Sequence, residues 1–438
     1  MKWRIPNTYV IIAVLLLLCA VFTWFVPGGQ YIKADDGSVS YSTVDSVPQT
    51  WQVFTAIYHG FVKQAGIIVF ILVVGGAFWL LNATGAVSAG ITRFISKVGK
   101  RDRWVLVALT LLFSLAGAVF GMSEETIPFV GMVVPLVVSM GYDAFMGMLI
   151  VYVAANVGFS SAFLNPFTVG LAQGMASLPL FSGMGYRIVC WGILTALLLV
   201  FVLVYAVRTR RTPEFSAARP VSEKLSGSQT AILSVLGVTV VMLVLGVTRW
   251  GWYMSEITGL FLVMGIVCGA IAGFSANRIA DELMAGAKDI LPAALVVGFA
   301  SGIIVILQEG RVVDSILHSM QEGLEGQGPM ASLSAMYGIQ AVINFLIPSA
   351  SAKAAITIPI MAPFADMVGV SRQAMVLAFQ FGDGFTNMLT PTSGVLMAAL
   401  AMARIPYEKW VKWVWKGTLA LLIIGLLLLL ATLFVPAF

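Results

Sequence analysis

Four ionisable side chains interrupt stretches of the chain that are otherwise apolar. Glu124 and Glu125 lie in the segment GMSEETIP, Lys353 lies in IPSASAK, and Asp383 lies in GDGFTNMLTPTSG. An ionised carboxylate or ammonium group surrounded by hydrocarbon costs several kcal/mol unless it is paired or hydrated. These residues therefore predict a site within the apolar part of the molecule, where a cation, a proton or water meets the charged side chains.

The composition places that site in a membrane protein. Of 438 residues, 59% are hydrophobic and 10% are charged, whereas about a quarter of an ordinary soluble domain is charged. The three cysteines lie in apolar runs, which indicates small hydrophobic side chains rather than disulfides. The sequence contains no phosphate loop, nucleotide motif or His/Cys cluster, so we expect neither an enzyme nor a prosthetic group. We expect a multi-pass protein of a bacterial-type inner membrane.

Long apolar runs predict an all-α polytopic fold. Runs that can cross roughly 30 Å of hydrocarbon lie at 8–27, 64–83, 186–207, 229–248, 254–276, 289–308 and 412–435. The first run is too long for the apolar part of a signal peptide, and no small-residue cleavage site follows it. We therefore expect it to be a retained span.

Shorter apolar pieces predict two re-entrant helical hairpins. They lie at 104–140 and 330–368, because Gly, Pro and charged residues fall at the expected tips. Each hairpin is followed by an apolar segment that is broken in its middle, 144–180 at GFSSAFLNPFT and 372–404 at GDGFTNMLTPTSG. Each unit would place a hairpin tip and a helix break near the membrane centre.

The two units are expected to be copies of one repeat. GFSSAFLNP matches GFTNMLTP with one gap, and LLNATGAVSAGI matches ILQEGRVVDSIL with one gap. Three residues recur at one constant offset, Ser123 as Ser351, Pro135 as Pro363, and Gly141 as Gly369. Chance matches in apolar sequence are the alternative, but the shared order of the matches favours a repeat.

If the N-terminus is placed in the cytoplasm, most Lys and Arg residues of the loops fall on the cytoplasmic side of the membrane. The C-terminus is then external and the hairpins enter from opposite faces, so we expect inverted repeats, the architecture of secondary transporters. The expected segments are an N-terminal span with an external loop (1–50), the first repeat (51–207), a cytoplasmic linker (208–228), two connecting spans (229–276) and the second repeat (277–438).

The tips and breaks would present four helix N-termini near the membrane centre. They are expected close to Ser123, Asn165–Thr168, Ser351 and Thr390–Ser393. Unpaired N–H groups and the positive end of the helix dipole suit a carboxylate. Because Pro is favoured at the first helical position, we expect Pro166 and Pro391 to begin helices with Asn165 and Thr390 as N-caps. Kinks in ordinary spans are the alternative.

Specific motifs extend from the first span to the last. They are GMSEETIPF, LNPFTVGLAQG with LPLFSGMGYRIV, and QFGDGFTNMLTPTSGVLMA with IPYEKW. These motifs closely resemble the YfcC-like transporters, relatives of the anaerobic C4-dicarboxylate carriers in the ion transporter superfamily. The resemblance implies a homodimer in the lipid bilayer, with a scaffold domain and a mobile, elevator-type transport domain. The chain departs from the expected uncharged, Gly/Gln-type second hairpin tip at Lys353.

The resemblance also implies that the hairpins and broken helices hold the substrate. The expected substrate-binding residues are Ser123, Glu124, Glu125, Asn165, Thr168, Ser349, Ser351, Lys353, Asp383, Asn387, Thr390, Thr392 and Ser393. Oxygen atoms near Ser160, Ser161, Thr386 and Asn387 could ligate Na⁺, and they are equally suited to direct substrate contact. Na⁺, H⁺ and a counter-substrate therefore remain the alternatives for driving transport.

The acidic tip requires a partner. A helix dipole favours a carboxylate at its N-terminus by only about 0.3–1 kcal/mol, which is too little to hold both Glu124 and Glu125 charged in a dry site. A substrate ammonium or guanidinium group would supply the missing positive charge. The alternative is that one Glu caps the hairpin and faces water.

Several interpretations of Lys353 and Asp383 are open. Asp383 lies between glycines that are expected to let the helix unwind, and it could pair with Lys353, orient the broken helix or bind substrate. Lys353 aligns with Glu125, so we expect it to neutralise the acidic tip or contact a substrate carboxylate, and to make transport independent of Na⁺. The alternative is a long side chain that extends into cavity water.

Secondary transport of an amino acid, by exchange or ion coupling, is the leading hypothesis. The YfcC-like branch is associated with basic amino-acid exchange, and more distant relatives carry dicarboxylates. A C4-dicarboxylate or other organic anion is the alternative, because Lys353 and the helix N-termini suit an anion. A channel or receptor is disfavoured, because a channel needs a continuous polar pore. The Trp- and Lys-rich segment 409–416 predicts an interfacial anchor and no nucleic-acid partner.

Overall fold

Helices form most of the chain that the structure describes. The computed structural model describes residues 8–33, 39–98, 102–210, 225–252, 254–323 and 326–435. Most of the expected cytoplasmic linker, 208–228, lies outside these residues.

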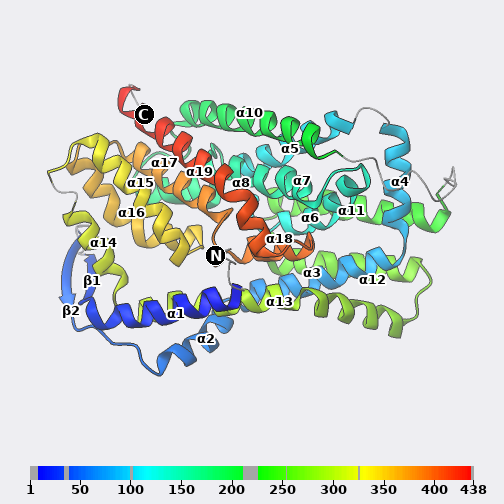
Figure 1. Ribbon diagram of the computed structural model, residues 1–438, viewed down its shortest axis with the longest axis horizontal. Coiled ribbons are helices and arrows are strands. Elements are labelled where there is room, and N and C mark those ends of the chain that lie inside the picture. Colours follow the sequence, from blue (N-terminus) through cyan, green and yellow to red (C-terminus); the bar gives the residue numbers. More distant parts are fainter. Residues whose placement is uncertain are drawn as a thin grey trace, which may run out of the picture.

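A two-stranded antiparallel sheet corrects the all-α prediction to a mostly helical fold. Strands β1 (Gly28–Lys33) and β2 (Val39–Val44) pair with Tyr31 opposite Tyr41. Their β-branched and aromatic residues favour strands, but neither strand lies in a long apolar run. The sheet packs against α14 (Val313–Glu322), where the Tyr31 N–H donates to Asp314 Oδ2 at 3.0 Å (Figure 1).

One group of helices packs around α13 (Ala276–Glu309). Its other members are α1 (Thr8–Phe25), α2 (Gln52–Lys63), α3 (Ala65–Ala83), α4 (Ala86–Val98), α11 (Gly227–Arg249) and α12 (Met254–Ile271). Helix α13 packs against α1, α2 and α3, and α12 packs against α3 and α11. Figure 1 shows α1, α13, α3 and α12 along the lower edge of the molecule. Phe78 of α3 and Phe261 of α12 contact each other in the apolar core of this group.

The segments predicted as hairpins and broken helices form two series of helices, which are separated in the chain by α11 to α14. The first unit contains α5 (Asp102–Phe120), α6 (Thr126–Ser139), α7 (Ala144–Met148), the π-helical turn η2 (Leu149–Val153), α8 (Ala154–Ser160), the π-helical turn η3 (Pro166–Gly170), α9 (Leu171–Met175) and α10 (Met184–Thr209). The second contains α15 (Pro329–Leu346), α16 (Ala350–Met367), α17 (Arg372–Asn387), α18 (Gly394–Met402), α19 (Tyr407–Ala431) and the short η5 (Thr432–Phe434).

The two units share two kinds of helix contact. The first arm of each hairpin packs against the first half of its own broken helix, α5 against α8 and α15 against α17. The second arm packs against the second half of the other broken helix, α6 against α18 and α16 against α9. Gly141 and Gly369, which align in the sequence, follow the two second arms with positive φ angles of 93° and 70°. These two kinds of contact are therefore equivalent in the two units.

Several helices of the described chain could cross a membrane by length and composition. Five meet this test: Ala65–Ala83, Asp102–Phe120, Met184–Thr209, Met254–Ile271 and Tyr407–Phe434. A sixth span results if the two halves of α13, bent by 41° after Pro292, count as one. Proline removes a backbone hydrogen bond and kinks a helix. The span predicted at 289–308 is thus the second part of a longer, bent helix.

Candidate functional site

The first helix break follows the predicted capping chemistry. The chain leaves α8 at Ser160 and resumes a helical conformation at Pro166. Asn165 Oδ1 accepts hydrogen bonds from the backbone N–H groups of Phe167 and Thr168 at 2.9 and 3.2 Å. The prediction that Asn165 caps a helix begun by Pro166 is therefore confirmed.

The second break is capped one turn later than predicted. Helix α18 begins at Gly394, and the Oγ of Ser393 accepts from the backbone N–H of Leu396 at 3.3 Å. The prediction of Thr390 as N-cap and Pro391 as first helical residue is wrong. The Thr390 N–H instead donates to the Thr386 carbonyl at 2.9 Å and continues the end of α17. The Thr390 hydroxyl pairs with that of Thr392 at 2.9 Å.

The glycines around Asp383 do not unwind the helix. Gly382 and Gly384 both lie within α17, which continues to Asn387. A Cβ atom at Gly382 would lie 2.8 Å from Gln340 Cβ of α15, and one at Gly384 would collide with Ser160. The glycines therefore permit close packing of α17 against α15 and α8, and the predicted unwinding is wrong.

Glu125 closes the tip of the first hairpin. Its carboxylate is buried, and Oε2 accepts from the backbone N–H of Ser123 at 3.1 Å. The hydroxyl of Thr126 donates to the Ser123 carbonyl at 2.6 Å, which tightens the same turn. The Glu125 side chain therefore stabilises the turn of the tip, but it makes no capping hydrogen bond to the first N–H groups of α6 and is buried, unlike the water-facing cap that was the alternative. Glu124 beside it is half-buried.

The first tip lies directly against the first break. The backbone N–H groups of Phe163 and Leu164 donate to the Ala118 carbonyl at 3.2 and 3.3 Å. A Cβ atom at Gly121 would lie 2.5 Å from Asn165 Oδ1. Glycine at this position therefore lets the hairpin tip approach the cap of the following helix.

Two buried polar atoms at the first break have no hydrogen-bond partner among the described residues. They are Nδ2 of Asn165 and Oγ1 of Thr168, which lie at the start of the helical segment η3–α9. A buried donor left without a partner costs about 1–3 kcal/mol. Such groups commonly bind a ligand or water, so both residues are suited to the substrate-binding role expected for them.

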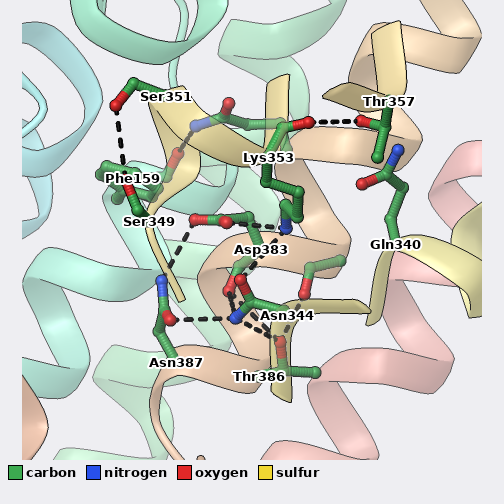
Figure 2. A network of polar contacts seen from close by, with 12 residues as sticks. Phe159, Gln340, Asn344, Ser349, Ser351, Lys353, Thr357, Asp383, Thr386 and Asn387 are labelled. Atoms are coloured by element: carbon green, nitrogen blue, oxygen red, sulfur yellow. Dashed lines mark hydrogen bonds and ion pairs between the residues drawn. The ribbon is translucent and has the colours of Figure 1, made fainter. Parts of the chain in front are cut away.

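Lys353 forms a fully buried ion pair with Asp383. The Nζ atom lies 2.7 Å from Asp383 Oδ1, and both side chains are 0% exposed. It also donates to Asn344 Oδ1 at 3.1 Å (Figure 2). The interpretation of Asp383 as a partner of Lys353 is confirmed. The expectation that Lys353 neutralises the first, acidic tip is corrected, because its ion pair is with α17 and the Glu125 carboxylate is bonded to its own tip.

Asn344 connects the second hairpin to the second broken helix. Its Nδ2 lies 2.9 Å from both Thr386 Oγ1 and Asn387 Oδ1, and 3.1 Å from the Asp383 carbonyl (Figure 2). Asn387 Nδ2 donates in turn to Asp383 Oδ2 at 3.1 Å. These bonds, with the Lys353 pair, fasten both arms of the hairpin to α17. Sequence reasoning missed Asn344, whose only signal is an amide at the end of an apolar run.

Aromatic side chains cover the carbonyl end of α17. The carbonyls of Asn387, Met388 and Leu389 accept from Tyr152 Oη at 2.9 Å, Trp410 Nε1 at 2.8 Å and Tyr407 Oη at 2.7 Å, respectively. Trp410 is fully buried, so its prediction as part of an interfacial anchor is wrong. Trp415 is exposed, as an anchor requires. Sequence reasoning also missed Tyr152 and Tyr407 as site residues.

The hydroxyls proposed as Na⁺ ligands each bond to the preceding helical turn. Ser160 Oγ donates to the Asn156 carbonyl at 2.7 Å, Ser161 Oγ to Val157 at 2.8 Å, and Thr386 Oγ1 to Gly382 at 2.6 Å. Over the described ranges, no group of three or more His, Cys, Asp or Glu residues is arranged to hold a metal ion.

The remaining expected residues lie around the second tip and break. Ser349 precedes α16 and is half-buried, with its hydroxyl 3.4 Å from that of the exposed Ser351. Thr392 Oγ1 donates to the Phe345 carbonyl at 2.9 Å, which links the break to the end of α15. The structure thus places the second tip and second break in direct contact.

Comparison with known proteins assigns the chain to a family. Residues 5–434 match the family described as the C4-dicarboxylate anaerobic carrier, DcuC. The chain is 34% identical to the Escherichia coli (strain K12) protein named "Putative basic amino acid antiporter YfcC", over 94% of this chain and 93% of that protein. The chain belongs to the DcuC family. It is therefore a multi-pass membrane transporter and not an enzyme.

More distant proteins resemble this DcuC family member along their whole length. An uncharacterized protein of Haemophilus influenzae Rd is 25% identical over 98% of this chain and 96% of that protein. The YdaH transporter of Alcanivorax borkumensis matches with 18% identity and a TM-score of 0.44, over 97% of this chain and 98% of that one. MtrF of Neisseria gonorrhoeae, whose structure is described as illuminating a class of antimetabolite efflux pumps, matches with 15% identity and a TM-score of 0.48, over 98% and 95%.

Proposed function

We propose that this DcuC family member exchanges a basic amino acid across a bacterial inner membrane by alternating access. The E. coli relative is named as an antiporter of this substrate class. In this proposal the substrate lies between the first hairpin tip, the first break and the second broken helix.

The pairing of Lys353 with Asp383 is the observation that carries the proposal. Both groups are fully buried, so the one cationic side chain among the expected site residues is already neutralised and does not face a substrate. Glu124 and Glu125 place two carboxylates at the first tip. Carboxylates favour a cationic substrate over an anion.

The first break supports binding of the amino acid's α-carboxylate. Asn165 Nδ2 and Thr168 Oγ1 are donors without a protein partner among the described residues, and they lie at the N-terminal end of η3–α9. The half-buried Glu124, on the tip that lies against this break, would receive the ammonium or guanidinium group of the substrate's side chain. The two ends of a basic amino acid would thus have complementary partners.

A C4-dicarboxylate is the second candidate, because the family is named after carriers of such substrates. A dicarboxylate carries two negative charges, which a cationic side chain in the site would stabilise. The ion pair with Asp383 makes Lys353 poorly suited to this role, so the geometry favours the basic amino acid.

We also propose that the helices packed around α13 form a fixed scaffold and that the two hairpin units form the mobile transport domain. The equivalent contacts of the two units support an origin as repeats, and the distribution of Lys and Arg supports an inverted relation with a cytoplasmic N-terminus and an external C-terminus. The family resemblance supports a homodimer.

Counterflow in proteoliposomes tests the substrate class. Vesicles loaded with ornithine, with succinate or with buffer alone receive external labelled arginine or labelled succinate, and protein-free vesicles serve as the control. We expect labelled arginine to accumulate only against internal ornithine. Accumulation of succinate against internal succinate, without arginine exchange, would replace the proposal with the dicarboxylate alternative.

A further inference from the structure

A cationic side chain of the protein itself lies in the second half of the site, which is formed by the second hairpin and the second broken helix. Lys353 Nζ lies 2.7 Å from Asp383 Oδ1, 3.1 Å from Asn344 Oδ1 and 5.1 Å from the centroid of the Phe379 ring. Figure 2 shows the ammonium group between the carboxylate of Asp383 and the side chain of Asn344. Two oxygen atoms and an aromatic face therefore surround one cation.

These surroundings would suit a small monovalent cation equally well. Carboxylate and amide oxygens and the face of an aromatic ring stabilise positive charge whatever its source. Removing an ion from water costs several kcal/mol, which pairing and hydrogen bonds must offset. The Asp383 carboxylate is fully buried, and its second oxygen accepts a hydrogen bond from the neutral amide of Asn387 at 3.1 Å. The position thus requires one positive charge, and Lys353 supplies it.

The carbonyl end of α17 makes an independent set of contacts with side chains. Helix C-termini carry partial negative charge, and unwound carbonyls coordinate Na⁺ in transporters with broken helices. Here three successive carbonyls already accept hydrogen bonds from the side chains of Tyr152, Trp410 and Tyr407. The protein's own donors thus already satisfy one acceptor position on each of these carbonyls.

We propose that Lys353 is a built-in counter-ion that takes the place of a dissociable monovalent cation, so that the second half of the site works without Na⁺. The consequence for folding stability does not depend on the proposed function, whereas the consequence for transport rests on it. Because a lysine cannot leave with the substrate, the charge of this half is the same on both sides of the membrane. A Na⁺ gradient then does no work at this position.

The cation dependence of stability tests the proposal without any substrate. Wild type, Lys353→Gln and the double variant Lys353→Gln/Asp383→Asn are unfolded by heat in NaCl, KCl and choline chloride of equal ionic strength. Wild type should melt at one temperature in all three salts. Lys353→Gln should melt much lower in choline and recover in Na⁺ or K⁺, because a free cation then neutralises Asp383. The double variant lacks both charges and should not respond to the cation.

A matched control and three outcomes complete the test. Lys63→Gln removes an exposed lysine that donates to Gln308 at 2.9 Å, and it should melt like wild type in every salt. A wild type that Na⁺ stabilises selectively overturns the proposal, as does a folded Lys353→Gln protein that no cation stabilises. If Lys353→Gln fails to fold in every salt while the double variant folds, a free cation cannot replace the lysine, and the proposal is again overturned.

Arginine binding separates this inference from the proposed function. Calorimetric titration of wild type with arginine should give the same affinity in NaCl and in choline chloride. A Na⁺ requirement for binding overturns the built-in counter-ion but leaves basic amino-acid transport in place. Absence of arginine binding in both salts overturns the proposed function. The thermal unfolding experiment then tests the built-in counter-ion independently.

Discussion

The hydroxyl of Tyr152 donates to the carbonyl of Asn387 at 2.9 Å and joins the broken helices of the two units. Tyr152 lies on the π-helical turn Leu149–Val153, and Asn387 is the last residue of α17. π-Helical turns within α-helices are frequent at functional sites. This contact therefore ties the geometry of the first unit to the break of the second.

Tyr152→Phe should lower stability and weaken substrate binding. Phenylalanine keeps the ring but leaves the Asn387 carbonyl without its donor, which costs about 1–3 kcal/mol for a buried group. Thermal unfolding of the purified variant measures the loss. Tyr58→Phe is the control, since the Tyr58 side chain is 68% exposed. Identical melting of the two variants would show that the Tyr152 hydrogen bond contributes nothing to stability.

Glu124→Gln should discriminate between charged and neutral ligands. Citrulline has the shape of arginine but an uncharged side chain, so the variant should lose affinity for arginine and keep its affinity for citrulline. The expected loss is about tenfold, or about 1.4 kcal/mol. Calorimetric titration measures both ligands, with the exposed Glu309→Gln as control. Equal losses for arginine and citrulline would reduce Glu124 to a structural role.

Glu125→Gln should behave differently, because the Glu125 carboxylate bonds to its own hairpin tip at Ser123. Glutamine keeps one acceptor oxygen but loses the charge that strengthens the bond. We expect a lower melting temperature and similar losses of arginine and citrulline binding. A selective loss of arginine binding, with unchanged melting, would instead place Glu125 in contact with the substrate.

The inverted relation of the hairpins can be tested by labelling single cysteines. Ser139→Cys lies at the end of α6, and Met367→Cys lies at the end of α16, where Met367 is 64% exposed. Each is made in a background without Cys19, Cys190 and Cys268. An impermeant maleimide added to intact cells should label one position and not the other. Labelling of both from outside would rule out inverted repeats.

Gly158→Ala should destabilise the contact between the first hairpin and its broken helix. A Cβ atom at Gly158 of α8 would collide with the backbone carbonyl of Ser114 on α5. Overpacking of this kind typically costs about 1–3 kcal/mol, and thermal unfolding would report it. Gly192→Ala on α10 is the control, because nothing lies within 4 Å of the added methyl group. A Gly158→Ala protein as stable as the control would contradict the close approach.

Local chemistry was sufficient to predict the first break and insufficient for the second. Asn165 is followed directly by Pro166, so one cap and one helix start were available, and both were correct. At the second break Thr390, Thr392 and Ser393 are all capable caps. Tertiary contact decides between them, because the Thr392 hydroxyl donates to Phe345 and Ser393 remains to cap α18.

The remaining features of the site depend on residues far apart in the chain. Asn344 and Asp383 are separated by 39 positions, and Tyr152 and Asn387 by 235. No spacing rule connects such residues before the helices pack. A glycine in a helix can mark either a hinge or a close contact. At Gly382 the neighbouring Gln340 identifies a close contact, and the sequence alone does not reveal that neighbour.

The small sheet that packs on α14 has a mechanical consequence for the proposed transport domain. The Gly29 N–H donates to the Arg311 carbonyl at 2.9 Å, and the rings of Tyr41 and His318 stack with centroids 3.7 Å apart, so the start and the middle of α14 are tied to the segment that follows α1. A displacement of α15 relative to α13 must then be absorbed after α14. Gly326, with a φ of 78°, and Gly328 lie in that stretch. In the proposed movement, we therefore expect the second hairpin to pivot close to these glycines.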